Sequence, residues 1–390
     1  MTVDLTPIHV AVIGSGIAGA ACAAGLRSAG MQVTVFEKLA AVGGQMASRC
    51  ARWTDGDGTE HSVDFDLGAS GFTRIRPRFK SLMTRAMAAG CVSEWQPKVH
   101  TDWPLNRGRR LVAAPSMLAL AGHLLSDTPV HCNRTVQRLQ RAADGAWYVA
   151  TNGAPLAGPF QYVAMAVAPA QAALLLAGHD DAWANALVAK RAEPCWTLMA
   201  VTDDVDWPWD ASVPKRGPLD WILRNDRVPG RSVPPGLAVW TAHATAEWSA
   251  AHLDDEPQAV SAALQSALRA QLPAVHSDNR AVKWHYTDVH RWRYARAASE
   301  GNESFGNDSH GNEHFGKDEC RWDESLGLGV CGDFFAAGGV EAAWQSGDEL
   351  ADHMAASSER TTSFAYVDDT LDAPSQIAPS IRLPAIALSP

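Results

Sequence analysis

Cysteine is scarce in this chain of 390 residues, and none of its seven cysteines belongs to a CxxC pair. An odd number of isolated thiols disfavours a disulfide framework and is typical of a reducing compartment. The first apolar run, which starts near Ile8, also lacks the basic segment that precedes the core of a secretory signal. We therefore predict free thiols and a cytoplasmic protein.

The sequence also lacks any cluster of basic side chains, and its formal net charge is −10. Because nucleic acids and anionic membranes bind clustered Lys and Arg, neither is expected as a partner. No uninterrupted apolar stretch of about 18 residues is present, so a membrane span is not expected. The 46% hydrophobic content is ample for a buried core. These properties predict a soluble globular protein with small-molecule partners, and they leave its oligomeric state open.

Two kinds of catalytic site are missing as well. No GxSxG motif follows a predicted strand, which argues against a serine nucleophile of the hydrolase type. The stretch HGNEH at residues 310–314 fits an inverted zinc-protease pattern, but that pattern requires a helix, and here Gly and Asn surround it. We interpret it as a chance match and predict no metal site.

What the sequence does contain is a dinucleotide motif close to its start. Residues 8–13 are apolar and β-branched, and they lead into the turn GSGIAG at residues 14–19 and an Ala-rich helix expected at residues 20–29. The order of strand, glycine turn and helix is the one that holds a pyrophosphate in nucleotide-binding proteins. The spacing therefore predicts a dinucleotide site.

Each glycine of the turn has a physical use. Gly14 permits the tight turn, Gly16 lets the backbone approach a pyrophosphate, and Gly19 allows helix and strand to pack closely. The first residues of the helix, Ile17 and Ala18, bring free N–H groups and the positive end of the helix dipole to the phosphates.

A second strand is predicted at residues 32–36, and it ends in Glu37 and Lys38. A carboxylate at this point can accept hydrogen bonds from an adenosine ribose and would repel a phosphate in place of the 2′-hydroxyl. The strand, helix, second strand and acid all stand at the distances that an adenine dinucleotide requires.

The segments that follow resemble the flavin-dependent amine oxidase and renalase families. GGQMASR at residues 43–49 is similar to the family loop GG-x-x-x-x-R, and DFDLGASGF at residues 64–72 is similar to the family segment D-x-G-A. In those families the first loop lies along the FAD pyrophosphate, and the second segment passes close to the flavin. Gln45 stands where many relatives carry Arg, which keeps a hydrogen-bonding amide but removes a charge from the phosphates.

The end of the chain carries the closing motif of the same families. LGVCGD at residues 328–333 and GGVEAAWQSG at residues 338–347 resemble a strand, a Gly-Asp pair and a helix start. The resemblance implies that Asp333 holds the ribityl chain and that the helix from about Val340 points its positive end at the flavin. Segments in the middle of the chain narrow the resemblance to bacterial renalase-like proteins, over about Ile8 to Ala355; they are residues 110–117, 218–231, 246–249 and 290–295.

The motif and the resemblance together predict a non-covalently bound FAD. The residues assigned to it are Gly14, Gly16, Ile17, Ala18, Gly19, Glu37, Lys38, Gly44, Gln45, Arg49, Gly68, Ala69, Val136, Gly332, Asp333, Gly339 and Val340.

The predicted fold class is α/β, with a Rossmann-type FAD-binding domain built on a parallel sheet and a second, α+β substrate domain with a mixed or antiparallel sheet. The FAD domain is expected at residues 1–75, 112–170 and 320–356, and the substrate domain at 76–111 and 171–298. Residues 299–319 are predicted to be a mobile insertion, and residues 357–390 a loosely packed tail. Further expected elements are strands at 130–136, 161–167 and 237–242 and helices at 170–176 and 258–272.

Three residues of the second half are our candidates for the catalytic cavity: Trp221, His243 and Arg293. An Arg in the cavity could hold a substrate carboxamide or phosphate, and the alternative is a structural cation paired with Asp or Glu. His243 has a similar alternative as a structural histidine, and most of the tryptophans are expected in the core. Strand alternation puts Arg291 and Arg293 on one face and His290, Trp292 and Tyr294 on the other.

The resemblance implies an FAD-dependent oxidase that takes a hydride from the 2- and 6-dihydro isomers of NAD(P)H onto flavin N5 and passes the electrons to O2, giving H2O2. One alternative is an FAD-dependent amine oxidase or desaturase acting on a small amine or biosynthetic intermediate, because these enzymes share the FAD motifs. Another is a flavin-binding protein without turnover. The sequence leaves the choice of substrate and of electron acceptor open.

Overall fold

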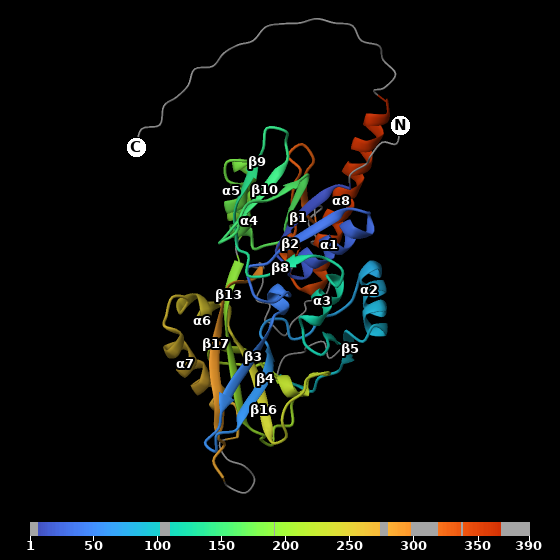
Figure 1. The fold of residues 1–390 in the computed structure, drawn as a ribbon. Helices are drawn as coiled ribbons and strands as arrows, with labels where there is room; N and C mark the ends of the chain where they lie inside the picture. Colours follow the sequence, from blue (N-terminus) through green and yellow to red (C-terminus); the bar gives the residue numbers. More distant parts are fainter. Residues whose placement is uncertain are drawn as a thin grey trace, which may run out of the picture.

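The computed structural model describes residues 7–101, 110–190, 192–273, 280–297, 319–336 and 338–367. Of the predicted insertion at residues 299–319 only Glu319 is described, so the HGNEH stretch lies outside the described residues, as does the chain from residue 368. Two large sheets lie one above the other in Figure 1.

The upper sheet has six strands in the order β18-β19-β12-β1-β2-β8. The strands β19, β12, β1, β2 and β8 are parallel, and β18 is antiparallel to β19. Their bounds are β1 His9–Ile13, β2 Gln32–Phe36, β8 Val130–His131, β12 Tyr162–Met165, β18 Arg321–Asp323 and β19 Leu328–Val330. The predicted parallel sheet is confirmed.

Both faces of this sheet are covered, because successive side chains of a strand point to opposite faces. Val10 and Val12 pack with one set of helices, while Ala11 and Ile13 pack in a separate cluster with the opposite set and a small sheet. The first set is α1 Ile17–Ser28, α2 Pro77–Ala88, α3 Ala119–Leu124 and α8 Val340–Val367. The opposite layer is α4 Pro169–Leu176, α5 Asp181–Val188 and the antiparallel strands β9 Val136–Arg141, β10 Trp147–Thr151 and β11 Ala157–Phe160.

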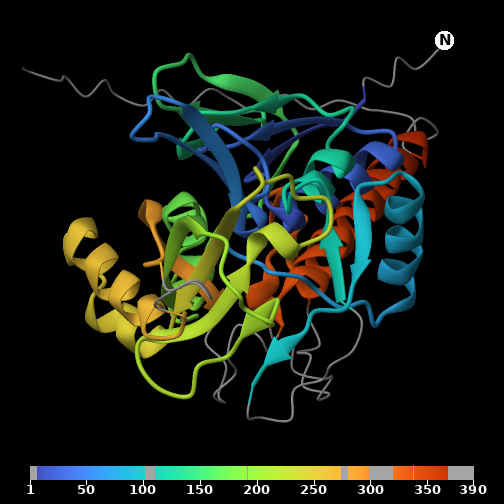
Figure 2. The same cartoon turned by 90° about the horizontal axis from the view of Figure 1, so that it is seen from below.

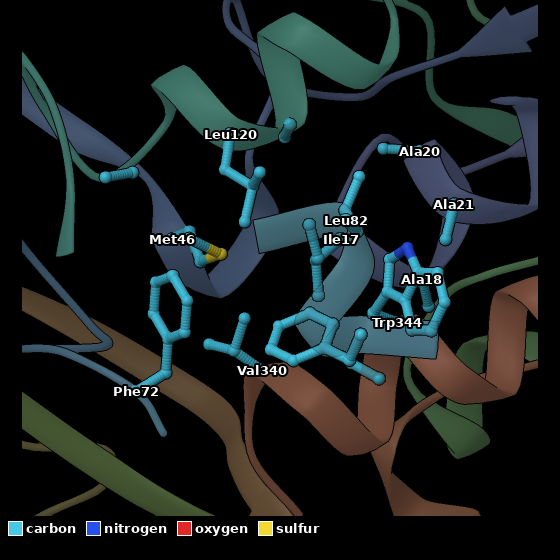
Figure 3. Packing of buried hydrophobic residues seen from close by; sticks show 14 of the residues in the cluster. Ile17, Ala18, Ala20, Ala21, Met46, Phe72, Leu82, Leu120, Val340 and Trp344 are labelled. Atoms are coloured by element: carbon cyan, nitrogen blue, oxygen red, sulfur yellow. The ribbon is translucent and has the colours of Figure 1, made fainter. Parts of the chain in front are cut away.

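The core under α1 lies directly behind the dinucleotide turn. Figure 3 shows Ile17 of α1, Phe72 and Val340 of α8 close together, with Trp344 beside them. Phe79 of α2 lies against Trp344, with 5.4 Å between the ring centroids. The first turns of α1 and α8 are thus packed on one shared cluster, so their N-termini are held in place together.

The lower sheet also has six strands, in the order β17-β13-β16-β15-β14-β6. All neighbours are antiparallel except β14 and β6, which makes the sheet mixed, as predicted. The bounds are β6 Val99–His100, β13 Ala192–Asp203, β14 Ala211–Ser212, β15 Leu219–Arg224, β16 Leu237–Ala244 and β17 Trp284–Ala297.

Each face of the lower sheet has its own cover. On the outer face, α7 Pro257–Arg269 packs through Leu264 and Leu268 and α6 Ala246–Ala251 packs through Trp248. Figure 2 shows both helices on the side away from α8. The hairpin of β3 Ser48–Thr54 and β4 Glu60–Asp66 covers the inner face, where Phe65 packs with Met199. The inner face is therefore the one that packs against the β3–β4 hairpin.

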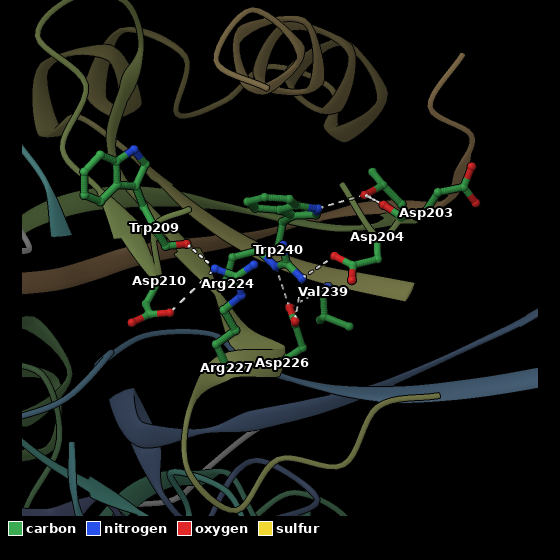
Figure 4. A network of polar contacts seen from close by, with 10 residues as sticks. Asp203, Asp204, Trp209, Asp210, Arg224, Asp226, Arg227, Val239 and Trp240 are labelled. Atoms are coloured by element: carbon green, nitrogen blue, oxygen red, sulfur yellow. Dashed lines mark hydrogen bonds and ion pairs between the residues drawn. The ribbon is translucent and has the colours of Figure 1, made fainter. Parts of the chain in front are cut away.

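A buried charge network stiffens the lower sheet (Figure 4). The Arg224 guanidinium is 2% exposed, donates to Asp226 at 2.7 and 2.9 Å and to Asp204 at 2.9 Å, and lies 4.8 Å from the Trp240 ring centre. Burial alone would lower the pKa of Arg224, but the two carboxylates raise it. Asp226 also accepts the N–H of Val239 at 3.0 Å, which ties the short helix Asn225–Arg227 to β16.

Several sequence predictions need correction. The strand predicted at residues 130–136 is interrupted, because Asn133 has φ +55°; the two-residue β8 ends before it, and β9 starts a different sheet. The segment 76–111 is divided, since α2 packs on α8, β5 Val92–Trp95 pairs with β7 Arg110–Ala113, and only β6 joins the lower sheet. The helix α8 continues to Val367, past the predicted end of the domain at residue 356.

Candidate functional site

The turn after β1 can be formed only by glycine at two positions. Gly14 has φ +98°, and a Cβ there would lie 2.3 Å from the carbonyl oxygen of Ala166. A Cβ on Gly19 would lie 2.0 Å from the carbonyl oxygen of Gly14. The turn is therefore packed between strand and helix as the motif requires. Ile17 and Ala18 begin α1, whose N-terminal N–H groups open on the turn.

The acid at the end of β2 lies against this turn. Glu37 is 4% exposed, and its Oε2 accepts hydrogen bonds from the N–H of Ser15 at 2.9 Å and from Ser15 Oγ at 2.6 Å. Its Oε1 accepts the N–H of Leu39 at 2.8 Å. A carboxylate has about four acceptor positions, so capacity is left for ribose hydroxyls. Lys38 is exposed beside it, and Val136 starts β9 two residues after Arg134, whose N–H donates to the Glu37 carbonyl at 2.8 Å.

The second predicted loop meets the first, backbone against backbone. The N–H of Gly43 donates to the Ser15 carbonyl at 3.0 Å, and a Cβ on Gly44 would lie 2.9 Å from Gly16 Cα. Gly44 begins a short 3-10 helix, Gly44–Met46. Gly16 and Gly44 thus form a wall of bare backbone, and a side chain at either position would cover it.

The segment Leu67, Gly68 and Ala69 continues this wall. The N–H of Ala69 donates to the Gln45 carbonyl at 3.1 Å, and a Cβ on Gly68 would lie 2.1 Å from the same oxygen. The three loops that the sequence assigned to a cofactor therefore stand side by side at one edge of the upper sheet.

Asp333 lies at the carboxyl end of β19, at the edge where Gly14 follows β1. With β12 between them and about 4.8 Å between neighbouring strands, the two positions are roughly 10 Å apart. The N–H of Gly332 is held by Ser346 Oγ of α8 at 2.9 Å. Burial raises the pKa of Asp333 to about 6, although the backbone N–H groups of Gly339 and Phe334 act in the other direction. Gly339 and Val340 lead directly into α8, so its N-terminal N–H groups face this carboxyl.

These residues fit an FAD. A backbone wall at Gly16 and Gly44 suits a pyrophosphate, Glu37 suits a ribose, and a desolvated carboxyl at Asp333 needs hydroxyl donors of the kind that a ribityl chain has. The N-terminus of α8 follows Gly339 at the same edge, and its positive end would favour the negative charge of a reduced flavin held there.

The raised pKa of Asp333 has a measurable consequence for the protein without FAD. Because the folded-state pKa of about 6 exceeds the ordinary aspartate value of 3.8, this group stabilises the fold fully only below about pH 4, and the contribution is lost as the pH rises through 6. The cost above pH 7 is at most about 2–3 kcal/mol. We expect Asp333→Asn to raise the thermal midpoint of the apoprotein at pH 8 but not at pH 4, as read by circular dichroism.

Asp348 provides a matched control for this measurement. Burial also raises its pKa to about 6, but it lies on α8 against Arg78 of α2, 2.8 Å away. Asp348→Asn should also reduce the pH dependence of the thermal midpoint, but it should leave FAD binding unchanged. Asp333→Asn should weaken FAD binding. Equal FAD affinities for the two variants would contradict the assignment of Asp333.

The lower sheet presents a row of four side chains on its inner face. In register across the strands, His290 of β17 is opposite Thr197 of β13, Thr197 is opposite His243 of β16, and His243 is opposite Trp221 of β15. Thr197, His243 and Trp221 are fully buried. His243 Nε2 lies 2.9 Å from the Leu67 carbonyl, and the Arg110 guanidinium lies 6.0 Å from the Trp221 ring centre. Two of the predicted cavity residues, Trp221 and His243, are thus neighbours in the sheet, and His243 contacts the Leu67 segment.

The third predicted cavity residue, Arg293, is on the wrong face. The alternation along β17 is confirmed, but Arg291 and Arg293 point to the outer side, where Arg293 pairs with Asp254 at 2.9 Å and is 47% exposed. This is the structural alternative for an arginine. The opposite face carries His290 and Trp292, and it is the face that contacts the cofactor loops.

Those contacts join the loop at residues 43–49 to β17. Gln45 Nε2 donates to the Tyr294 carbonyl at 3.3 Å, and Arg49 Nη2 pairs with Asp288 Oδ2 at 2.6 Å. Burial and the positive charges of Arg49 and Lys38 lower the pKa of His290, which Asp288 opposes in part. His290 is therefore a neutral imidazole at pH 7, able both to donate and to accept.

Sequence reasoning missed the residues that hold the Leu67 segment. Asp66 and Arg231, each 3% exposed, form an ion pair of 2.5 Å, and Asp66 Oδ1 also accepts the N–H of Met117 at 3.0 Å and Ser48 Oγ at 2.8 Å. Both residues lie in segments that the resemblance singled out, so the signal was present, but nothing local links positions 165 residues apart.

Among the described residues, no group of three or more His, Cys, Asp or Glu side chains could hold a metal ion. None of the helices in the described ranges is long and apolar enough to cross a membrane.

Comparisons with known proteins agree with this geometry. Residues 12–86 match the family described as an NAD(P)-binding Rossmann-like domain. The upper sheet and the helices that cover it thus form a Rossmann-like domain. Over 101 residues the chain is 31% identical to a Synechococcus elongatus protein described as a probable zeta-carotene desaturase, a match that covers 26% of this chain and only 19% of the desaturase.

Solved structures extend the likeness to the second domain. A protein from Exiguobacterium sp. 255-15 assigned as a protoporphyrinogen oxidase has a TM-score of 0.62 at 10% identity, covering 90% of this chain and 99% of that one. Wild-type putrescine oxidase bound to putrescine has a TM-score of 0.59 at 12% identity, covering 90% and 99%. The Rossmann-like domain and the lower sheet together therefore have the fold of these oxidases.

Proposed function

We propose that this protein is an FAD-dependent oxidoreductase that oxidises the 2- and 6-dihydro isomers of NAD(P)H, with O2 as the final electron acceptor and H2O2 as the product. The observation that carries the FAD part is the convergence of the three Gly-containing loops with Asp333 and the start of α8 at one sheet edge. The choice of a dihydronicotinamide rests on the resemblance to renalase-like proteins.

The residues have separate tasks in this proposal. The turn at residues 14–19, Glu37 and Gly44 bind the adenosine diphosphate part of FAD, and Asp333 binds the ribityl chain. The bound flavin supplies the two-electron chemistry. The row at Trp221, Thr197 and His243 excludes water from the far side, because all three side chains are fully buried. Neutral His290, at the open end of the row, is placed to hydrogen-bond an uncharged carboxamide.

We propose further that the FAD is not attached through Cys331. Its thiol is fully buried, and a hydrogen bond to Cys22 together with burial raises its pKa well above the ordinary value, so it is held as an unreactive thiol. Acid precipitation should leave the flavin in the supernatant.

The decisive experiment is an anaerobic spectral titration of the purified flavoprotein. We expect the 2- and 6-dihydro isomers of NAD(P)H to bleach the 450-nm region within seconds, on the order of typical enzyme turnover times, and ordinary NADH to bleach it far more slowly. Readmitted O2 should restore the absorbance and form one H2O2 for each reduced flavin that it reoxidises. A flavin that neither isomer reduces would rule out this substrate class.

An amine oxidase is the second candidate. Structural likeness to putrescine oxidase favours it, as does Trp292 on the inner face of β17, because an indole can hold a cationic amine. Putrescine and monoamines belong in the same titration, and bleaching by an amine alone would select this alternative.

A further inference from the structure

The carbonyl of Leu67 receives two hydrogen bonds from the lower sheet. Thr197 Oγ1 donates to it at 3.1 Å, and His243 Nε2 lies 2.9 Å from it. Thr197 and His243 are direct neighbours across β13 and β16, and both are fully buried. A backbone carbonyl held by two buried donors has little freedom to move.

Thr197 is in turn oriented by an indole. Trp292 Nε1 donates to Thr197 Oγ1 at 3.1 Å. Since a hydroxyl has one proton and can also accept, this bond directs the Thr197 proton toward Leu67. Trp292 is half-buried on the inner face of β17, which also carries His290, and Gln45 donates to the Tyr294 carbonyl of the same strand. A chain of hydrogen bonds thus runs from Trp292 through Thr197 to Leu67.

The residues after Leu67 have no room to compensate for a movement of its carbonyl. A Cβ on Gly68 would lie 2.1 Å from the Gln45 carbonyl, and the N–H of Ala69 donates to the same oxygen at 3.1 Å. On the other side, the N–H of Leu67 donates to the Ala47 carbonyl at 3.1 Å. A displacement of the Leu67 carbonyl would therefore be passed to Gly68 and Ala69 rather than absorbed.

We propose that Thr197 is a positioning residue: through the Leu67 carbonyl it sets where the Leu67–Ala69 backbone lies against the flavin, and Trp292 links that position to the inner face of β17. This inference rests on the proposed function in one respect, namely that FAD is bound beside this segment. Backbone dipoles near a flavin favour one redox state over the other, so a shift of this segment changes the flavin itself and not only the stability of the fold.

The chain offers a matched control on the same strand. Thr202 of β13 is also fully buried; its Oγ1 donates to the Asp203 carbonyl at 2.7 Å and accepts Trp240 Nε1 at 2.9 Å. It has the same bonding pattern, but Trp240 packs with the helices on the outer face. Thr197→Val and Thr202→Val therefore remove equivalent bonds, one beside the proposed flavin and one away from it.

The test uses the full-length, FAD-loaded protein and a chemical reductant with a reference dye, so that no substrate needs to be known. We expect Thr197→Val to change the ratio of affinities for oxidised and reduced flavin about tenfold, a shift of about 30 mV for a two-electron couple. Thr197→Ser should restore the wild-type potential, and Thr202→Val should keep it while losing comparable thermal stability. Trp292→Phe should shift the potential in the same direction by less, which covers the case that Thr197→Val does not fold.

Equal potentials for wild type, Thr197→Val and Trp292→Phe would overturn the role of Thr197 while leaving the proposed function intact. A wild-type protein that retains no flavin would instead contradict the proposed function, and the positioning role with it.

Discussion

Replacing Arg231 by methionine is expected to lower the free energy of unfolding by about 3–5 kcal/mol, because it leaves a buried carboxylate without its cation. Arg231 donates to Asp66 through Nε at 2.8 Å and Nη2 at 2.5 Å, and through Nη1 to the carbonyls of Ala113 at 2.5 Å and Pro229 at 2.8 Å. Both charged groups are 3% exposed, so water cannot replace the lost partner. Urea unfolding followed by tryptophan fluorescence measures the loss.

The control is the exposed ion pair on the outer face of β17. Arg293 pairs with Asp254 at 2.9 Å, but the two side chains are 47% and 80% exposed. Arg293→Met should change stability by less than about 1 kcal/mol. If the two methionine variants unfold at the same urea concentration, the buried ion pair contributes no more to stability than the exposed one.

The second large effect is expected for Gly16→Ala, which should fold but lose FAD. Gly16 has φ −65° and ψ 178°, a conformation open to any residue, and a Cβ would meet only Gly44 Cα, at 3.7 Å. The methyl group would occupy the backbone wall where the pyrophosphate has to approach. We expect FAD affinity to fall roughly 100-fold, or about 2.7 kcal/mol, by fluorescence titration of the apoprotein.

Two other alanine variants serve as controls for the Gly16→Ala result. Gly14→Ala should not fold, since its φ of +98° and the 2.3 Å contact with Ala166 leave no room for a side chain. Gly56→Ala, in the turn between β3 and β4 with nothing within 4 Å, should match the wild type in both stability and FAD affinity. Tight FAD binding by Gly16→Ala would show that the cofactor does not approach the backbone there.

Local patterns were sufficient to predict the Rossmann-like half. The strand at Gln32–Phe36 was predicted with its observed bounds, and β1, α1 and α4 lie within a few residues of their predicted ranges. Apolar periodicity, a glycine turn and a proline at a helix start are all patterns of consecutive residues, so the sequence alone reveals them. The break at Asn133 was missed because a positive φ in a non-glycine residue leaves little trace in composition.

The site was predictable only as far as its chemistry is local. Alternation along β17 correctly separated Arg293 from His290, but which side faces inward depends on β17 pairing with β13 and on the helices that cover one face. The same holds for Thr197, which looks like an ordinary strand residue until Leu67, 130 positions away, is placed beside it. Contacts of this kind follow from the fold and not from the sequence around either partner.

The order of the strands in the upper sheet also bears on how the chain matures. β1 pairs with β12, and β12 pairs with β19. This edge of residues 9–13 can therefore pair only after residues 162–165 have been synthesised, and the far edge of residues 162–165 only after residues 328–330. Such distant pairings form slowly and late, since loop closure must come before the contacts that reward it. During synthesis the first βαβ unit leaves the ribosome with one sheet edge open, and Asp333 and α8 follow only after β12 and β19. On the proposed function, FAD is therefore expected to bind only once β19 has paired with β12, and not during folding of the first unit.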